Sequence, residues 1–166
     1  PQFEYIRKSV LAFNLPSVDL VNYEADDLIA TYVNQILKKG AKVTIVSSDK
    51  DLMQLFKKDV RIFDPMKNRF ISEEDVQKKF GVDPSKVIDV QALAGDSSDN
   101  VPGVPGIGVK TAAELINKYG NLETLLKSAN EIKQNKRRET LIENKDKALI
   151  SKKLVTSKDD AKADRD

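Results

Sequence analysis

Apolar positions in the first half of the chain follow alternating helical and extended patterns. A helical spacing connects Phe3, Ile6, Val10 and Phe13. This spacing predicts a helix over residues 3–15, which Pro16 ends, and a second amphipathic helix is predicted over residues 24–39. Short apolar runs predict strands at residues 18–21, 41–47, 60–63 and 69–71, with a short helix at residues 51–57. This order of strands and helices is typical of a parallel α/β sheet.

The pattern becomes helical after residue 71. Ser72 and Asp75 have the spacing of a helix N-cap box, which predicts a helix that ends at Gly81. We therefore expect an α/β core over residues 1–83 and a helical domain over residues 84–156.

The two ends of the chain carry their own signals. Residues 157–166 contain no apolar residue larger than alanine, so they are expected to form a disordered tail. Because Pro1 stands where a methionine would begin a complete protein, we expect the chain to be a piece of something longer.

Composition restricts the chemistry that the chain can perform. Apolar residues make up 40% and charged residues 33%, which is typical of a soluble globular protein. The sequence has no cysteine and no histidine, which excludes disulfides, Cys/His zinc sites, thiol nucleophiles and histidine-based triads. Any metal site must use oxygen ligands, which favour hard cations such as Mg²⁺, Mn²⁺ or Ca²⁺.

Charge is distributed unevenly along the chain. Residues 1–100 carry 14 Lys and Arg against 16 Asp and Glu, whereas residues 101–166 carry 14 against 10. This distribution favours metal binding in the first part and a polyanion partner in the second, although two ordinary solvated surfaces would look the same. The sequence shows neither a membrane-spanning apolar run nor a signal segment, so we expect a cytoplasmic protein with no membrane contact.

Seven acidic residues stand beside three expected element boundaries: Glu24, Asp26 and Asp27; Asp49 and Asp51; Asp96 and Asp99. Each cluster alone could simply cap a helix or form a turn. If the fold gathers the clusters, however, their mutual repulsion calls for neutralising cations. Gathered carboxylates of this kind suit phosphoryl hydrolysis with two divalent metal ions.

A glycine-rich hairpin, Pro102–Ala112, is the most specific segment of the chain. We expect Gly103, Gly106 and Gly108 to adopt backbone conformations closed to other residues, so that amides can approach an anion. A helix expected over residues 111–119 presents further amides there, and Lys110 and Thr111 stand at its start. A tight turn that needs glycine only for packing is the alternative.

Basic residues follow the hairpin. Residues 127–153 hold nine Lys and Arg against four acids, which could extend a contact with a nucleic-acid backbone or only form a solvated face. Because no base-reading side chain is evident in the hairpin, we expect any DNA binding to be independent of sequence.

Together the strings YEADD, SDKDL, GDSSDN and PGVPGIGVKTA resemble the 5′-nuclease domains of bacterial DNA polymerase I and the wider flap endonuclease family. The resemblance extends from Pro1 to about Val155. It implies a parallel-sheet, PIN-like nuclease core followed by a helix–three-turn–helix DNA-binding domain. It further implies Mg²⁺-dependent 5′-3′ exonuclease and flap cleavage in DNA replication and repair, with duplex or flapped DNA as the partner of a monomer.

The resemblance assigns site residues motif by motif. It implies one metal site at Glu24, Asp26 and Asp27, a second at Asp96 and Asp99, and Asp49 and Asp51 between the two. Asp26, Asp49 and Asp51 are the implied catalytic residues. It also implies a K⁺ ion bound by the backbone carbonyls of Leu93, Ala94, Pro102, Val104 and Ile107.

Other features of the resembled family, namely an upstream metal-binding aspartate and a helical arch, would precede Pro1. The resemblance therefore implies that this chain alone binds metal weakly and cleaves poorly. Two hypotheses stay open at this point: a metal-dependent nuclease, or a non-catalytic DNA-binding module whose acids are structural. A PIN-type ribonuclease is a third and weaker candidate, because it does not predict the hairpin.

Overall fold

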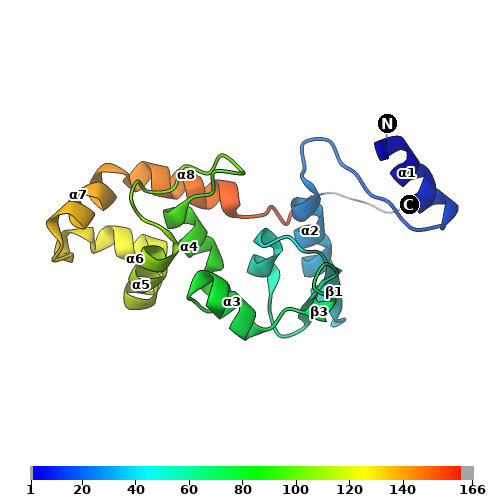
Figure 1. Cartoon of the computed structure of the whole chain (residues 1–166), viewed down its shortest axis with the longest axis horizontal. Helices are drawn as coiled ribbons and strands as arrows, with labels where there is room; N and C mark the ends of the chain where they lie inside the picture. The colour runs from blue at the N-terminus through cyan, green and yellow to red at the C-terminus, as the bar shows by residue number, and fades with distance from the viewer. Residues whose placement is uncertain (1, 162–166) are drawn as a thin grey trace.

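The computed structural model describes residues 2–161 and is elongated (Figure 1). A small α/β part lies in the middle of the long axis, between a helical part at one end and the first helix at the other. One hydrophobic core joins the α/β and helical parts, since it includes Val33, Ile62, Leu93 and Leu141. Because this core is continuous, the domain boundaries at residues 83 and 156 stay a prediction.

The N-terminal segment is the most exposed part of the fold. Helix α1 (Gln2–Ala12) forms as expected, but none of its residues is buried, and Phe3 is 83% exposed. The strand predicted at residues 18–21 does not form, and that prediction is wrong for this chain. A strand needs a hydrogen-bonded neighbour, and among residues 2–161 no strand pairs with this segment.

The sheet has three strands in the order β1-β2-β3. Strands β1 (Val43–Val46) and β2 (Val60–Asp64) are parallel, with Ile45 opposite Ile62. The predicted parallel pairing is therefore found between β1 and β2, whereas strand β3 (Arg69–Phe70) pairs antiparallel with β2 and makes the sheet mixed. The reason is the short connection between β2 and β3, because a parallel return needs a crossover of a dozen or more residues.

Two elements bring acidic residues to one end of this sheet. Helix α2 (Ala25–Lys38) packs on β1 and starts with the first acidic cluster. The 3₁₀ helix η1 (Asp51–Leu55) follows β1 directly and carries the second cluster at its start.

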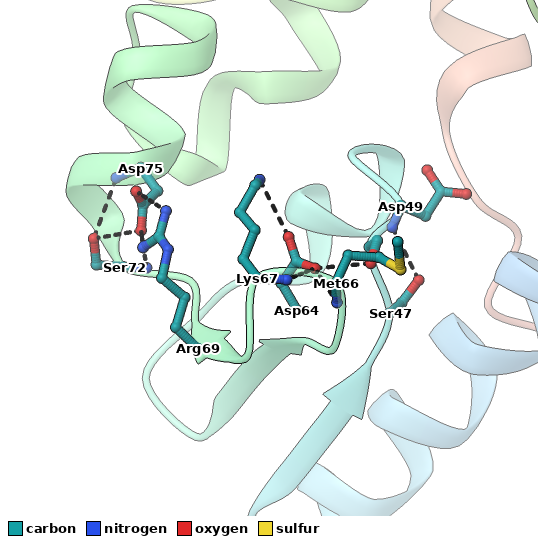
Figure 2. Close-up of polar contacts among 9 residues, drawn as sticks. Ser47, Asp49, Asp64, Met66, Lys67, Arg69, Ser72 and Asp75 are labelled. Carbon is teal, nitrogen blue, oxygen red and sulfur yellow. Dashed lines mark hydrogen bonds and ion pairs between the residues drawn. The ribbon is translucent and has the colours of Figure 1, made fainter.

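Helix α3 (Glu73–Phe80) begins as the sequence predicts, at an N-cap box between Ser72 and Asp75. The amide of Asp75 donates to the Ser72 hydroxyl, and the Asp75 carboxylate accepts from the Ser72 amide. Arg69 at the end of the sheet donates two hydrogen bonds to the same carboxylate, at 2.7 and 2.8 Å (Figure 2). These contacts, Arg69 first, hold the pKa of Asp75 well below its usual range.

The helical part consists of η2 (Pro84–Lys86), α4 (Val87–Ala94), α5 (Val109–Tyr119), α6 (Leu122–Lys127), η3 (Ala129–Glu131), α7 (Asn135–Glu143) and α8 (Lys145–Val155). Helix α4 is central and packs against α5 and α8. Lys152 of α8 forms ion pairs with Asp89 of α4 and Glu123 of α6, both at 2.7 Å, and so connects three helices. Within residues 2–161 no helix is long and apolar enough to cross a membrane.

The segment after α8 is held in place at its start, although the sequence predicted a disordered tail. The Lys158 amide donates to Asp27 Oδ1 at 2.6 Å, and the Ala161 amide donates to Thr31 Oγ1 at 3.2 Å. Figure 1 shows this segment running from α8 to the N-terminal end of α2. Residues 157–161 are held by hydrogen bonds to Asp27 and Thr31 of α2, and such long-range acceptors cannot be recognised from composition. Residues 162–166 of the predicted tail lie outside the described residues.

Asp64, the last residue of β2, is a buried carboxylate with a full set of donors. It is 3% exposed and accepts hydrogen bonds from Ser48 Oγ at 2.8 Å and from the Met66 and Lys67 amides at 2.9 and 3.2 Å (Figure 2). The Ser48 hydroxyl is the largest influence that lowers the pKa of Asp64 to about 2, and Lys67 adds to it.

We predict that this carboxylate makes the chain sensitive to acid. Because the pKa of Asp64 is lower in the folded chain, its contribution to stability is present above its ordinary pKa of 3.8 and is lost as the pH falls towards about 2. Asp64→Asn should lower the urea midpoint at pH ~7 and reduce the further fall between pH ~4.5 and ~2. Glu74→Gln, an exposed acid on α3, is the control. A midpoint for Asp64→Asn that matches this control at both pH values would contradict the prediction.

Candidate functional site

A cavity of about 450 Å³ lies beside the carboxyl end of β1 and is lined by acids from all three clusters. Six of the seven predicted acids line it: Glu24, Asp26, Asp49, Asp51, Asp96 and Asp99. The first pair comes from the start of α2, the second from the start of η1, and the third from the loop after α4. The fold therefore gathers carboxylates that are up to 75 positions apart in the sequence.

Asp27 is the predicted ligand that the structure does not bring to the cavity. It is 8% exposed, and its two carboxylate oxygens accept from the amides of Glu24, at 3.3 Å, and Lys158, at 2.6 Å. Asp27 thus closes the first turn of α2 and holds the segment after α8. Its neighbour Asp26 does line the cavity, and Asp26 Oδ1 accepts from the Asp27 amide at 3.0 Å.

The second cluster is shaped by the turn between β1 and η1. The Asp49 amide donates to Ser47 Oγ at 3.0 Å, and Asp49 Oδ1 accepts from the Asp51 amide at 2.9 Å. Figure 2 shows the Asp49 side chain extending away from the strand that precedes it. Asp49 and Asp51 thus lie on either side of one turn, which follows the carboxyl end of β1.

Asp51 is the more enclosed of these two acids. Burial raises its pKa, and the nearby charges of Asp49 and Asp99 act in the same direction. A hydrogen bond that Gln91 of α4 donates to Asp51 Oδ1 opposes this rise. The carboxylate therefore sits where its negative charge is costly unless a donor or a cation accompanies it.

The third cluster is tied to the α/β part by an ion pair. Lys50 Nζ contacts Asp96 Oδ2, and Ser98 donates to Asp96 Oδ1. Lys50 is the main reason that the pKa of Asp96 falls to about 2, and the same contact raises the pKa of Lys50. Two mutual backbone hydrogen bonds between Asp96 and Val101, at 3.0 and 2.8 Å, close the loop that presents Asp96 and Asp99.

The donor set of this cavity fits a hard divalent cation, because it consists of carboxylates and amide oxygens without nitrogen or sulfur ligands. As the side chains stand, no three acids among residues 2–161 lie close enough to hold one ion together. Lys50 engages one of the acids and Gln91 another. The carboxylates surround a common space but do not form a closed ligand cage.

The hairpin after α4 is built around Gly103. This residue has φ +59°, and a Cβ there would lie 2.5 Å from the backbone nitrogen of Gly95, so only glycine fits. Its amide donates to the buried Ser151 hydroxyl of α8 at 2.9 Å. The positive φ predicted for Gly103 is therefore confirmed, its amide is used inside the fold, and DNA binding at Gly103 stays a prediction.

The tip of the hairpin is open. Gly106 has φ +74°, and nothing lies within 4 Å of a Cβ placed on Gly106 or Gly108. Gly108 is extended, with φ −88° and ψ 174°, so it does not adopt the special conformation that the sequence suggested. It is instead the N-cap of α5, which begins at Val109 rather than at Thr111. Lys110 is exposed and Thr111 half-buried in the first turn.

The carbonyl groups predicted to bind K⁺ lie where α4 meets the hairpin. The Leu93 carbonyl accepts from the Val104 amide at 2.8 Å, and the Val104 carbonyl accepts from the Ile107 amide at 3.1 Å. A carbonyl oxygen has a second lone pair, so these bonds do not preclude a cation. K⁺ binding by Leu93, Ala94, Pro102, Val104 and Ile107 stays a prediction.

A second hollow, of about 510 Å³, adjoins the hairpin tip. Its walls are Pro105, Gly106 and Ile107 on one side and the first turns of α7, including Lys136 and Arg137, on the other. Part of the basic stretch noted in the sequence is therefore adjacent to the hairpin.

Three residues that shape the site, Lys50, Gln91 and Ser151, are hard to recognise from local sequence. Lys50 stands inside the SDKDL string, where its charge between two acids was a usable signal. Gln91 and Ser151 lie on helices with ordinary apolar patterns, and no local feature marks their long-range partners Asp51 and Gly103.

Comparison with known proteins agrees with this architecture of an acid-lined α/β core and a helical hairpin domain. Residues 1–81 match the sequence model described as "5′-3′ exonuclease, N-terminal resolvase-like domain", and residues 82–166 match "5′-3′ exonuclease, C-terminal SAM fold". The chain therefore belongs to the 5′-3′ exonuclease family.

Individual relatives point to the same family. DNA polymerase I of Rhizobium leguminosarum is 55% identical over 166 residues, which are 100% of this chain and 16% of that protein. The 5′-3′ exonuclease of Aquifex aeolicus is 44% identical over 127 residues, or 76% of this chain and 44% of that protein. The chain thus spans less than half the length of either curated relative.

A solved structure of bacteriophage T5 flap endonuclease, in a pseudo-enzyme–product complex with DNA and metal ions, superimposes with a TM-score of 0.81. It is 25% identical and covers 92% of this chain and 57% of its own. The fold is therefore that of a flap endonuclease with a SAM-like helical domain.

We predict that Lys50 sets the ionisation of Asp96. Lys50→Met removes the ion pair and should raise the pKa of Asp96 from about 2 towards its ordinary value of 3.8. Carboxyl ¹³C chemical shifts followed against pH measure this change directly. Asp75, whose partner is Arg69, is the internal control and should not shift. An unchanged Asp96 titration would show that Lys50 does not contact it in solution.

Proposed function

We propose that the chain carries the metal site and the DNA-binding hairpin of a 5′-3′ exonuclease and structure-selective flap endonuclease. Its reaction would be hydrolysis of DNA phosphodiesters with two divalent ions, Mg²⁺ or Mn²⁺. The observation that carries this proposal is the gathering of six carboxylates from three distant segments in one cavity. Membership of the 5′-3′ exonuclease family supports it.

Each acid that lines the cavity is assigned a role in holding the two metal ions. Glu24 and Asp26 would hold one ion, Asp96 and Asp99 the other, and Asp49 and Asp51 would lie between them. Asp27 is left out of this set because its side chain does not line the cavity and instead accepts from two backbone amides. Divalent ions at such a site activate water and offset the charge of the transition state.

The chain's own groups would prepare this site before any ion binds. Lys50 offsets the charge of Asp96, and Gln91 holds Asp51 through a neutral donor. The turn from Ser47 to Asp51 fixes Asp49 and Asp51 relative to the sheet. Asp26, Asp49 and Asp51 are the residues to which we assign catalysis.

DNA would bind along the open hairpin tip. Gly106, Gly108 and the first turn of α5 present backbone to solvent, and Lys110 and Thr111 stand beside them. These groups would contact phosphates rather than bases, so binding would not depend on sequence. A K⁺ ion at the hairpin carbonyls would support the same contact, and Lys136 and Arg137 would extend it.

A non-catalytic DNA-binding module is not favoured, because purely structural acids would not gain from lining one cavity, where they repel one another.

The proposed setting is a monomer that acts on DNA in the cytoplasm during replication and repair. Because the relatives are longer than this chain, cleavage is proposed for the full-length protein. The chain alone is expected to bind metal weakly and to cleave poorly.

Loss of Asp49 should abolish most cleavage. The full-length protein should cut a 5′-flap substrate when Mg²⁺ is present, and Asp49→Asn should slow this by about a hundredfold, because metal stabilisation of the transition state is worth several kcal/mol. Single-turnover cleavage on a gel measures the rate. Asp19→Asn, an exposed acid outside the cavity, should cleave like the parent. If Asp49→Asn were as fast as the parent, the role assigned to Asp49 would be wrong.

Loss of Lys110 should weaken DNA binding equally for all sequences. Removing one phosphate contact should also reduce the slope of log affinity against log salt by about 1. Fluorescence anisotropy with several duplexes in Ca²⁺, at a series of salt concentrations, measures both effects for Lys110→Ala. Lys118→Ala, in the last turn of the same helix, is the matched control. Unchanged affinity for Lys110→Ala would count against the hairpin as the DNA contact.

A further inference from the structure

Gln91 is one of two buried polar residues on α4, the other being Asp89, which pairs with Lys152. Its neighbours Val90, Ala92 and Leu93 are fully buried, and Gln91 itself is only 6% exposed while lining the acidic cavity. Its Nε2 donates a hydrogen bond to Asp51 Oδ1. This hydrogen bond connects Gln91 of the helical part with the Asp51 carboxylate of the α/β part.

The orientation of the Gln91 amide follows from chemistry. An ionised carboxylate can only accept hydrogen bonds, so the nitrogen of the amide must face Asp51. Its oxygen, Oε1, is buried and has no hydrogen-bond partner among the residues that the structure describes. A buried unpartnered oxygen costs stability, and an apolar side chain would avoid that cost. Packing alone therefore does not explain a glutamine at this position.

The charge of the donor distinguishes Gln91 from Lys50, which contacts a different acid of the cavity. Lys50 pairs directly with Asp96, whereas the amide of Gln91 holds Asp51 in place without adding a positive charge. The charges of Asp49 and Asp99 repel the Asp51 carboxylate and that of Lys50 attracts it, and the Gln91 donor holds the carboxylate in one position among these charges.

We propose that Gln91 is a positioning residue that holds the Asp51 carboxylate in the cavity, ready for a divalent ion. This inference rests on the proposed function, because it assigns Asp51 to metal binding. It makes the geometry of that ligand depend on the packing of α4, the same helix that leads into the loop of Asp96 and Asp99.

The test is a double-mutant cycle on the full-length protein, with Mn²⁺ alone as the probe and calorimetry and EPR as readouts. Gln91→Met keeps the length of the side chain and removes the donor. It should weaken Mn²⁺ binding by about tenfold, which is the size of effect that positioning partners have on metal affinity. In an Asp51→Asn background the same substitution should change the affinity by less than about twofold, because the two residues act as one unit.

Two further variants separate positioning from general stability. Thr31→Val removes a buried polar group outside the cavity and should leave Mn²⁺ affinity unchanged. Gln91→Asn keeps the amide but is too short to reach Asp51, so it should match Gln91→Met. If both Gln91 variants bind Mn²⁺ like the parent, Gln91 does not position Asp51, and the proposed function is untouched. If Asp51→Asn also binds like the parent, or the parent binds no Mn²⁺, the metal site itself is refuted together with this inference.

Discussion

Repulsion among crowded carboxylates governs how the acidic cavity of this chain is built. Six acids share one cavity, and no arrangement of like charges is stable there without neighbours that offset them. The chain supplies these neighbours from different segments: Lys50 on Asp96, Gln91 on Asp51, and backbone amides on Asp26 and Asp49. The remaining negative charge is what makes the cavity suited to divalent cations.

A second consequence concerns how the two parts of the chain are joined. Helix α8 reaches the hairpin through Ser151 and Gly103, and the segment that follows it reaches the start of α2 through Lys158 and Asp27. Val155 and Ser157 also bond to Gln54 of η1, at 3.1 and 3.2 Å. One continuous stretch of chain therefore fixes the hairpin and the acidic cavity relative to each other.

Local pattern was a good guide wherever a residue's partners are close in sequence. The N-cap box of Ser72 and Asp75 and the helices after Pro84 form as predicted, because their contacts span only a few positions. The pattern failed at residues 18–21 and in the direction of β3, where the outcome depends on which strand lies alongside. It also failed for the conformation of Gly108, since glycine permits an unusual conformation but does not require one.

The oxygen-only chemistry, the three acidic clusters and the hairpin motif can be read from the amino-acid sequence, because they are properties of composition and short spacing. The tertiary structure alone decided which acids share a cavity, that Asp27 turns to backbone amides, and that residues 157–161 lie on α2. It also decided that Gln91 reaches Asp51 over 40 positions of sequence. The physical reason is that packing brings together groups whose separation along the chain carries no information about their distance in space.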